Sequence, residues 1–155
     1  MRLLPTIFLI CATALLLADC SRDIYQQRAD TMKDHVEAFY KDLKSDRVAA
    51  AIMENEQIEA MARQMEDGIL KRQNQLAASE VDRDWMQVKA ANETAAENWP
   101  ALAKYLVIKK RYDQARGTYQ RILATYSDAR HRTYAEQAKA GLRDLDLILA
   151  PAKGS

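Results

Sequence analysis

Few residues in this sequence could support catalysis or bind a metal. The two histidines, His35 and His131, lie far apart, and no HExxH, Glu-x-x-His or CxxC pattern supplies metal-ligand spacing. Asp128 and His131 could chelate an ion, but two ligands on a turn make a weak site, and an exposed loop is the preferred interpretation. GxSxG, phosphate-binding glycine loops and dinucleotide fingerprints are also missing. We therefore expect no catalytic residue, no metal, no cofactor and no enzyme.

The two cysteines are associated with an apolar segment near the N-terminus: Cys11 lies within it and Cys20 lies at its polar end. Met1 and Arg2 precede an almost wholly apolar run from Leu3 to Ala18, after which polar residues begin. The run has about 16 residues, whereas a helix that spans a bilayer needs about 20. The sequence therefore predicts a secretory signal segment over residues 1–19, outside the folded part.

The residues before this cysteine resemble the lipobox of bacterial lipoproteins, in which leucine and small residues precede a cysteine. Leu17 and Ala18 match the pattern, and Asp19 departs from it. The resemblance implies cleavage before Cys20 and lipidation of Cys20, and Ser21 resembles the residues that permit outer-membrane sorting. Two or more acyl chains anchor a protein stably. We expect a lipoprotein of the outer or inner membrane that faces the periplasm; ordinary signal-peptidase cleavage and an uncleaved anchor are the alternatives.

The composition indicates a helical protein. Hydrophobic residues make up 48% and charged residues 29%, while glycine occurs only 4 times and proline 3 times. Such sequences favour long helices over disorder or an all-β fold. The formal net charge of +1 creates no overall field that would attract nucleic acid. We therefore expect an all-α fold and no nucleic-acid partner.

Apolar residues at helical spacing define the expected elements. Ser45 or Asp46 is expected to cap the second helix, and Ser79 opens a capping-box pattern before the third. Pro100 is expected to end that helix and begin a new one, because proline is tolerated in a first helical turn. The expected helices cover residues 23–44, 47–78, 79–99, 100–109, 112–126 and 130–149.

Residues 99–127 match the spacing of the tetratricopeptide repeat, W-x2-L-G-x2-Y followed by A-x3-F and P. The matching positions are Trp99, Leu102, Ala103, Leu106, Ala115, Tyr119 and Ser127. The chain thus resembles a tetratricopeptide-repeat (TPR)-like bacterial lipoprotein, although only one repeat matches convincingly. The resemblance implies a helical hairpin whose concave face binds a peptide or helix of a partner. A generic helical bundle is the alternative.

This interpretation divides the chain into a signal segment (1–19), a helical and possibly coiled-coil-like region (20–98), and a TPR-like hairpin with a capping helix (99–150). Trp99, Leu102, Ala115 and Tyr119 are assigned to packing. Exposed residues near the hairpin groove are the predicted partner-binding set: Lys104, Tyr105, Lys109, Arg111, Tyr112 and Arg116.

The predicted function is a membrane-anchored adaptor or scaffold that binds other envelope proteins. One alternative is a homo-oligomeric structural component, because Met32, Val36, Phe39 and Leu43 form an apolar stripe suited to a coiled coil. Another is a pilotin-like helper of outer-membrane assembly, which rests on analogy with other small helical lipoproteins.

Overall fold

The computed structural model describes residues 24–150, and this part of the chain is entirely helical, without strands. Residues 24–150 form the α-helices α2 (Ile24–Lys44), α3 (Val48–Arg72), α4 (Ala78–Ile108), α5 (Tyr112–Thr125) and α6 (Arg132–Leu149), with a short 3-10 helix, η1 (Ala129–His131), before α6. The prediction of an all-α fold is confirmed. The predicted signal segment, Cys20 and Ser21 lie outside the described residues.

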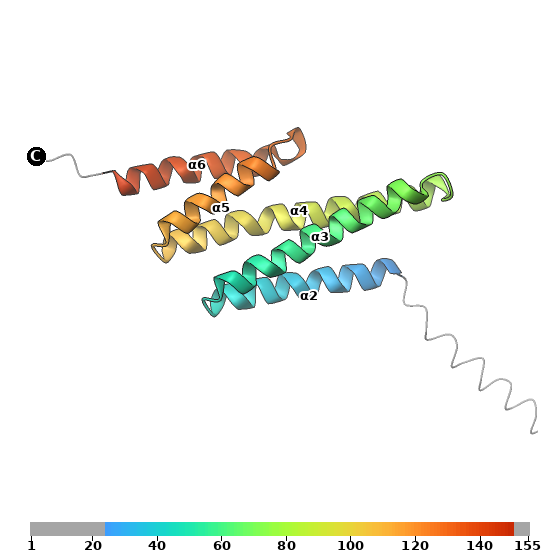
Figure 1. Ribbon diagram of the computed structural model, residues 1–155, viewed down its shortest axis with the longest axis horizontal. Coiled ribbons are helices and arrows are strands. Elements are labelled where there is room, and N and C mark those ends of the chain that lie inside the picture. Colours follow the sequence, from blue (N-terminus) through green and yellow to red (C-terminus); the bar gives the residue numbers. More distant parts are fainter. Residues whose placement is uncertain (1–23, 151–155) are drawn as a thin grey trace, which may run out of the picture.

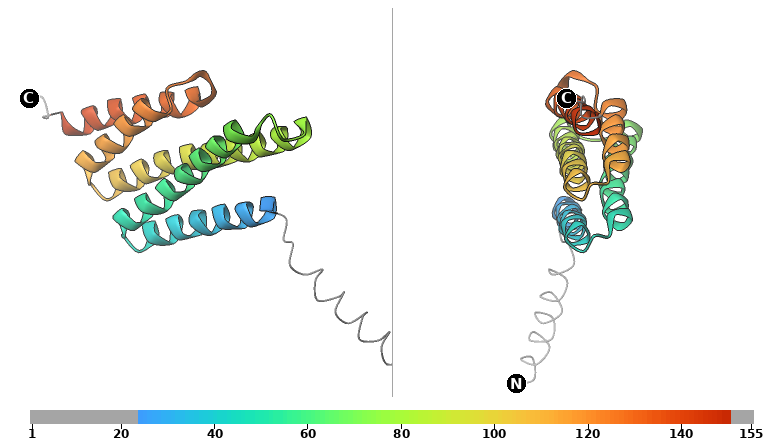
Figure 2. Two further views of the ribbon diagram at one scale, coloured as in Figure 1. Left: turned by 45° about the vertical axis from the view of Figure 1, so that its right-hand side comes forward. Right: turned by 90° about the vertical axis from the view of Figure 1, so that its left-hand side faces the viewer.

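The helices form two layers. Figure 1 shows α2, α4 and α6 running in the same direction, while α3 and α5 return between them. The end-on view in Figure 2 places α3 and α5 in a layer beside α2 and α4. Consecutive helices pack against each other, and α4 also contacts both α2 and α6. The arrangement is therefore a row of helical hairpins that bury their apolar faces against their neighbours.

The turns that follow α2 and α4 have the same backbone structure. Asp46 and Lys110 both adopt a φ of 57°. The next residues, Arg47 and Arg111, have φ and ψ of −90° and 63°, and of −89° and 62°. Each arginine N–H donates to the carbonyl oxygen of the residue five positions earlier, at 2.9 Å and 2.8 Å. A left-handed residue after the last turn is a common way to end a helix, and here the same turn connects α2 to α3 and α4 to α5.

The helix break predicted at Pro100 is wrong. Helix α4 continues through this proline, so the expected elements 79–99 and 100–109 are one helix. Proline in a helix interior cannot donate to the carbonyl four residues earlier, here Ala96, and costs about 3 kcal/mol. Pro100 is buried, and Asn55 of α3 donates to the carbonyl oxygen of Ala95 in the same turn at 3.1 Å. Tertiary packing therefore outweighs the local preference of proline.

The predicted boundary between the second and third helices is also displaced. Helix α3 ends at Arg72 rather than near Ala78, and α4 begins at Ala78, before the predicted start. Ser79 is thus inside the helix and does not cap it. Instead, the carboxylate of Glu80 accepts the backbone N–H of Ala77 at 3.1 Å. Because this N–H precedes the first turn, Glu80 satisfies a donor that the helix itself cannot pair.

The buried core has two parts. The larger part joins α2 to α6 and contains the residues assigned to packing, since Trp99, Leu102, Ala115 and Tyr119 are exposed by only 1%, 0%, 0% and 5%. The smaller part lies between α3 and the first half of α4. It consists of Ile58, Ala62, Met65, Ile69, Val88, Ala91 and Ala95. The packing role predicted for the four repeat residues is confirmed.

Candidate functional site

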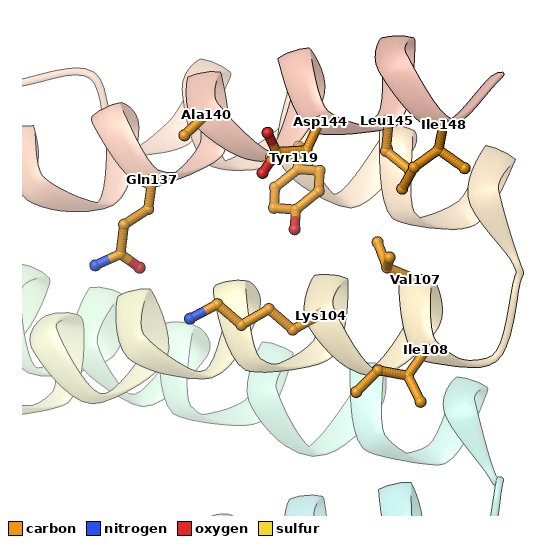
Figure 3. Close-up of a pocket in the computed structure, with 10 residues that line it drawn as sticks. Lys104, Val107, Ile108, Tyr119, Gln137, Ala140, Asp144, Leu145 and Ile148 are labelled. Carbon is orange, nitrogen blue, oxygen red and sulfur yellow. The ribbon is translucent and has the colours of Figure 1, made fainter. Parts of the chain in front are cut away.

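A groove between α4 and α6 is the candidate site. It consists of two adjoining cavities of about 480 Å³ and 530 Å³, which share Lys104 of α4 and Gln137 of α6. Figure 3 shows the first cavity, with Tyr119 of α5 between the two helices. Each cavity lies within the size range of about 300–1,000 Å³ that is typical of ligand pockets. The parallel helices α4 and α6 therefore form the walls of this groove.

The two cavities differ in chemistry. The first is mostly apolar, and its apolar lining consists of Val107, Ile108, Tyr119, Ala140, Leu145 and Ile148. The second is more polar and includes Glu93, Glu97, Arg130, Thr133 and Tyr134. Along α4 and α6 the groove thus changes from a polar end to an apolar end, which is suited to a peptide segment with matching polarity.

Gly141 sets the distance between α6 and the floor of the groove. A Cβ atom at this position would lie 2.2 Å from Cζ of Tyr119, so only glycine lets the ring lie directly against α6. Burial raises the pKa of the Tyr119 hydroxyl, and the negative charge of Asp144 raises it further. The phenol therefore stays neutral at physiological pH, and its ring provides an apolar floor.

Two oppositely charged side chains line opposite walls of the apolar cavity, Lys104 on α4 and Asp144 on α6. Neither forms an ion pair or a side-chain hydrogen bond with another residue of the described range. In Figure 3, Lys104 extends along α4 towards Gln137, while Asp144 lies beside the Tyr119 ring. Both charges are available to a ligand, and hydrogen bonds to charged groups are stronger than hydrogen bonds between neutral groups.

The six residues predicted to bind a partner do not all face this groove. Lys104 lines it, and Arg116 pairs with Asp146 of α6 at 2.7 Å. Tyr112 packs against the larger core, and Lys109 lies 5.5 Å from the centre of a neighbouring tyrosine ring. These contacts occur within the chain. Partner binding by the six residues stays a prediction.

The last two of the six, Tyr105 and Arg111, contact the turn between α2 and α3. The Tyr105 hydroxyl donates to Oδ1 of Asp46 at 2.7 Å, and the Arg111 guanidinium donates to Oδ2 at 2.6 Å. The Tyr105 hydrogen bond, assisted by the charge of Arg111, lowers the pKa of the Asp46 carboxyl group. Asp46 is therefore not the helix cap that the sequence predicted. It connects the two repeated turns and fixes one hairpin against the next.

Sequence analysis missed a buried carboxylate that joins α3, α4 and α5. Glu59 is 6% exposed, and its Oε1 accepts hydrogen bonds from Trp99 Nε1 at 2.8 Å and from the Tyr126 hydroxyl at 2.7 Å. Its Oε2 accepts from Arg121 at 3.0 Å, and the Arg121 guanidinium lies 4.0 Å from the centre of the Trp99 ring. Burial, together with the hydrogen bond to Glu59, raises the pKa of Tyr126 strongly. This network fixes the position of α5 and hence of the groove floor.

The only sign of this polar layer in the sequence is the interruption of the apolar stripe at Glu54-Asn55-Glu56. Asn55 is fully buried and accepts a hydrogen bond from Asn98 of α4 at 2.8 Å. Buried polar groups are tolerated when they are paired. The interruption therefore marks the place where polar contacts replace apolar packing between α3 and α4.

Comparison of the chain with protein-family models, with curated proteins and with solved structures found no match. Within residues 24–150, His, Cys, Asp and Glu side chains nowhere gather in threes as a metal site would need. In the same range, each helix is either too short or too polar to cross a bilayer. The groove is accordingly interpreted from its own geometry.

Proposed function

We propose that this protein is a TPR-like adaptor that binds a segment of another envelope protein in the groove between α4 and α6. The observation that carries this proposal is the groove itself. It combines an apolar floor with charged side chains on both walls, Lys104 and Asp144, that have no partner among residues 24–150. A concave, mostly apolar surface with a few polar groups is the usual form of a ligand-binding site.

The hairpin architecture supports the TPR-like part of the proposal. Small residues allow the helices of a TPR hairpin to approach closely, and Ala103 of α4 and Ala115 of α5 are both fully buried in the larger core. The α2–α3 hairpin has the same turn, so the stack consists of two hairpins and a final helix. Repeat proteins of this kind bury a continuous core by stacking such units, and they bind partners on one extended face.

The proposed partner segment is apolar along one side and polar at one end. Its apolar side would lie against Tyr119, Leu145 and Ile148, and its polar end would lie near Glu97 and Arg130. An amphipathic helix or an extended peptide presents its side chains in this way. Burial of apolar surface contributes about 25 cal/mol per Å², and the charged walls determine which segments fit.

The proposal also includes attachment to a membrane of the cell envelope through a lipid on Cys20. Ile24, the first residue of α2, lies four positions after Cys20. Four residues span at most about 14 Å, so the anchor would hold the α2 end of the stack close to the bilayer. In the protein purified from its own cells, mass spectrometry of the N-terminal peptide should find a fatty-acylated Cys20. An unmodified Cys20, or an intact segment 1–19, would contradict this part.

Photo-crosslinking in cells tests the adaptor role. A photoreactive phenylalanine analogue at position 137, inside the groove, should yield a discrete adduct with another envelope protein. The same analogue at position 120, an exposed site on α5 outside the groove, is the control and should yield none. Introducing Lys104→Glu should remove the adduct from position 137, because it reverses the charge on one wall. Equal adducts from both positions would contradict docking in the groove.

A further inference from the structure

We infer that the groove between α4 and α6 also binds a second copy of this chain, as a pair related by two-fold symmetry. The inference deepens the proposed function, since it places a second copy in the groove that the adaptor would use. The two copies would face each other through α4 and α6, so that the exposed apolar side chains beside each apolar cavity meet those of the other copy.

Apolar side chains gather at the open end of this groove. Ile108 at the end of α4 is 77% exposed, and Ile148 near the end of α6 is 51% exposed. Both line the same cavity. Leu147 and Leu149 lie on either side of Ile148 in the sequence and are 76% and 47% exposed. Contiguous exposed apolar side chains mark interaction sites on soluble domains, because leaving them in water costs free energy that association recovers.

The charges around the cavity are self-complementary. In a two-fold interface the same patch occurs on both sides. When the two-fold axis runs along the groove, as this inference requires, each group on one wall meets the opposite wall of the other copy. Lys104 of α4 would then face Asp144 of the second copy, and Asp144 would face the second Lys104. The apolar residues between them would meet their own counterparts. Both ion pairs would therefore form from side chains that lack a partner within residues 24–150.

A second copy fits this distribution better than a partner of one charge. An acidic segment would be attracted by Lys104 but repelled by Asp144. A basic segment would be attracted by Asp144 but repelled by Lys104. A patch with one charge of each sign on opposite walls satisfies both charges when it meets its own rotated copy. The paired state would also cover Gln137 and Lys104, so a partner protein would have to displace the second copy.

A charge-swap experiment on the purified full chain in mild detergent tests this inference. Light scattering and sedimentation, with the detergent contribution subtracted, should give the mass of a dimer that dissociates on dilution. Lys104→Glu or Asp144→Lys alone should raise the dissociation constant by roughly tenfold or more, because each places like charges face to face. The double variant restores opposite charges and should return the constant to within about threefold of the original.

The matched controls are Lys33→Glu and Asp82→Lys, which make the same changes in net charge at exposed positions outside the groove. They should leave the dissociation constant unchanged. Circular dichroism of every variant should show native helix content, since both groove residues are exposed and make no contact that folding requires. A double variant that associates as weakly as the single variants would overturn the inference.

A monomer at every concentration, or a dimer that ignores both single reversals, would equally overturn it. The measurement concerns the purified chain alone, whereas the adaptor role is tested by cross-links to another protein in cells. A monomer that still cross-links through position 137 would contradict self-association and leave the proposed function intact. A dimer that yields no cross-link to another protein through position 137 would support self-association and contradict the proposed function.

Discussion

Replacing Glu59 by alanine should lower the free energy of unfolding by about 2–6 kcal/mol, because the buried Trp99 and Tyr126 donors lose their acceptor and each unsatisfied buried donor costs about 1–3 kcal/mol. The change leaves the Arg121 guanidinium, the Trp99 indole N–H and the Tyr126 hydroxyl without their common acceptor. Each of these donors then loses a hydrogen bond inside the protein, which costs more than a lost contact at the surface. Urea denaturation followed by circular dichroism measures the difference.

Glu56 provides a matched control, because it binds the same arginine. Its Oε1 accepts from Arg121 at 2.7 Å, but its side chain is 44% exposed. Glu56→Ala should therefore cost only about 0–1 kcal/mol, as surface ion pairs do. Similar losses for Glu56→Ala and Glu59→Ala would contradict the view that the buried carboxylate, rather than the charge of Arg121, fixes α5 against α3.

Gly141→Ala should destabilise the protein by about 1–2 kcal/mol. The added methyl group would lie 2.2 Å from Cζ of the Tyr119 ring, which is buried beside α6. Overpacking of this kind costs about 1–3 kcal/mol, and the better helix propensity of alanine returns at most about 1 kcal/mol. The ring must move into the groove or α6 must move away from α5, and thermal or urea denaturation records the loss.

Gly117→Ala is the matched control on the adjacent helix. A Cβ atom at this position has nothing within 4 Å, and the residue is exposed. The substitution should therefore stabilise the protein by about 0.5–1 kcal/mol through helix propensity alone. Opposite signs for the two glycines are expected. A stabilising Gly141→Ala would show that Tyr119 does not lie against α6 as described.

Sequence reasoning located the helices that local signals define. The expected elements 23–44 and 112–126 agree closely with α2 and α5, because a regular apolar stripe and a clear turn mark both. Asp128 caps η1 in the same local way, because its carboxylate accepts the backbone N–H groups of Arg130 and His131, both at 3.0 Å. These features depend on residues that are close in sequence.

The errors arose where distant residues decide the structure. Pro100 lies inside α4 because the surrounding helices bury it, and no local rule contains that information. Aspartate is a residue type that often caps helices, but the Asp46 carboxylate instead accepts hydrogen bonds from Tyr105 and Arg111 of the next hairpin. Glu59 looks like a surface residue of an amphipathic helix until α4 and α5 are placed around it. Propensity is a weak guide when tertiary contacts oppose it.

The candidate site could be predicted only in part for the same reason. Lys104 was selected from its exposed position on the hairpin, and it does line the groove. Gln137, Gly141 and Asp144 lie on α6, whose position beside α4 depends on the packing of α5 between them. The sequence marked α6 only as a capping helix, so it gave no reason to assign half of the groove to that helix.

A variant whose side chain fills the groove should prevent a partner segment from docking there. Ala140 lies in the wall of the apolar cavity, and Ala140→Trp would fill much of that space. In cells that carry the photoreactive analogue at position 137, this variant should abolish the adduct, while Ala124→Trp at an exposed site on α5 should leave it unchanged. An adduct that persists at full yield in the Ala140→Trp variant would contradict docking of a partner in this groove.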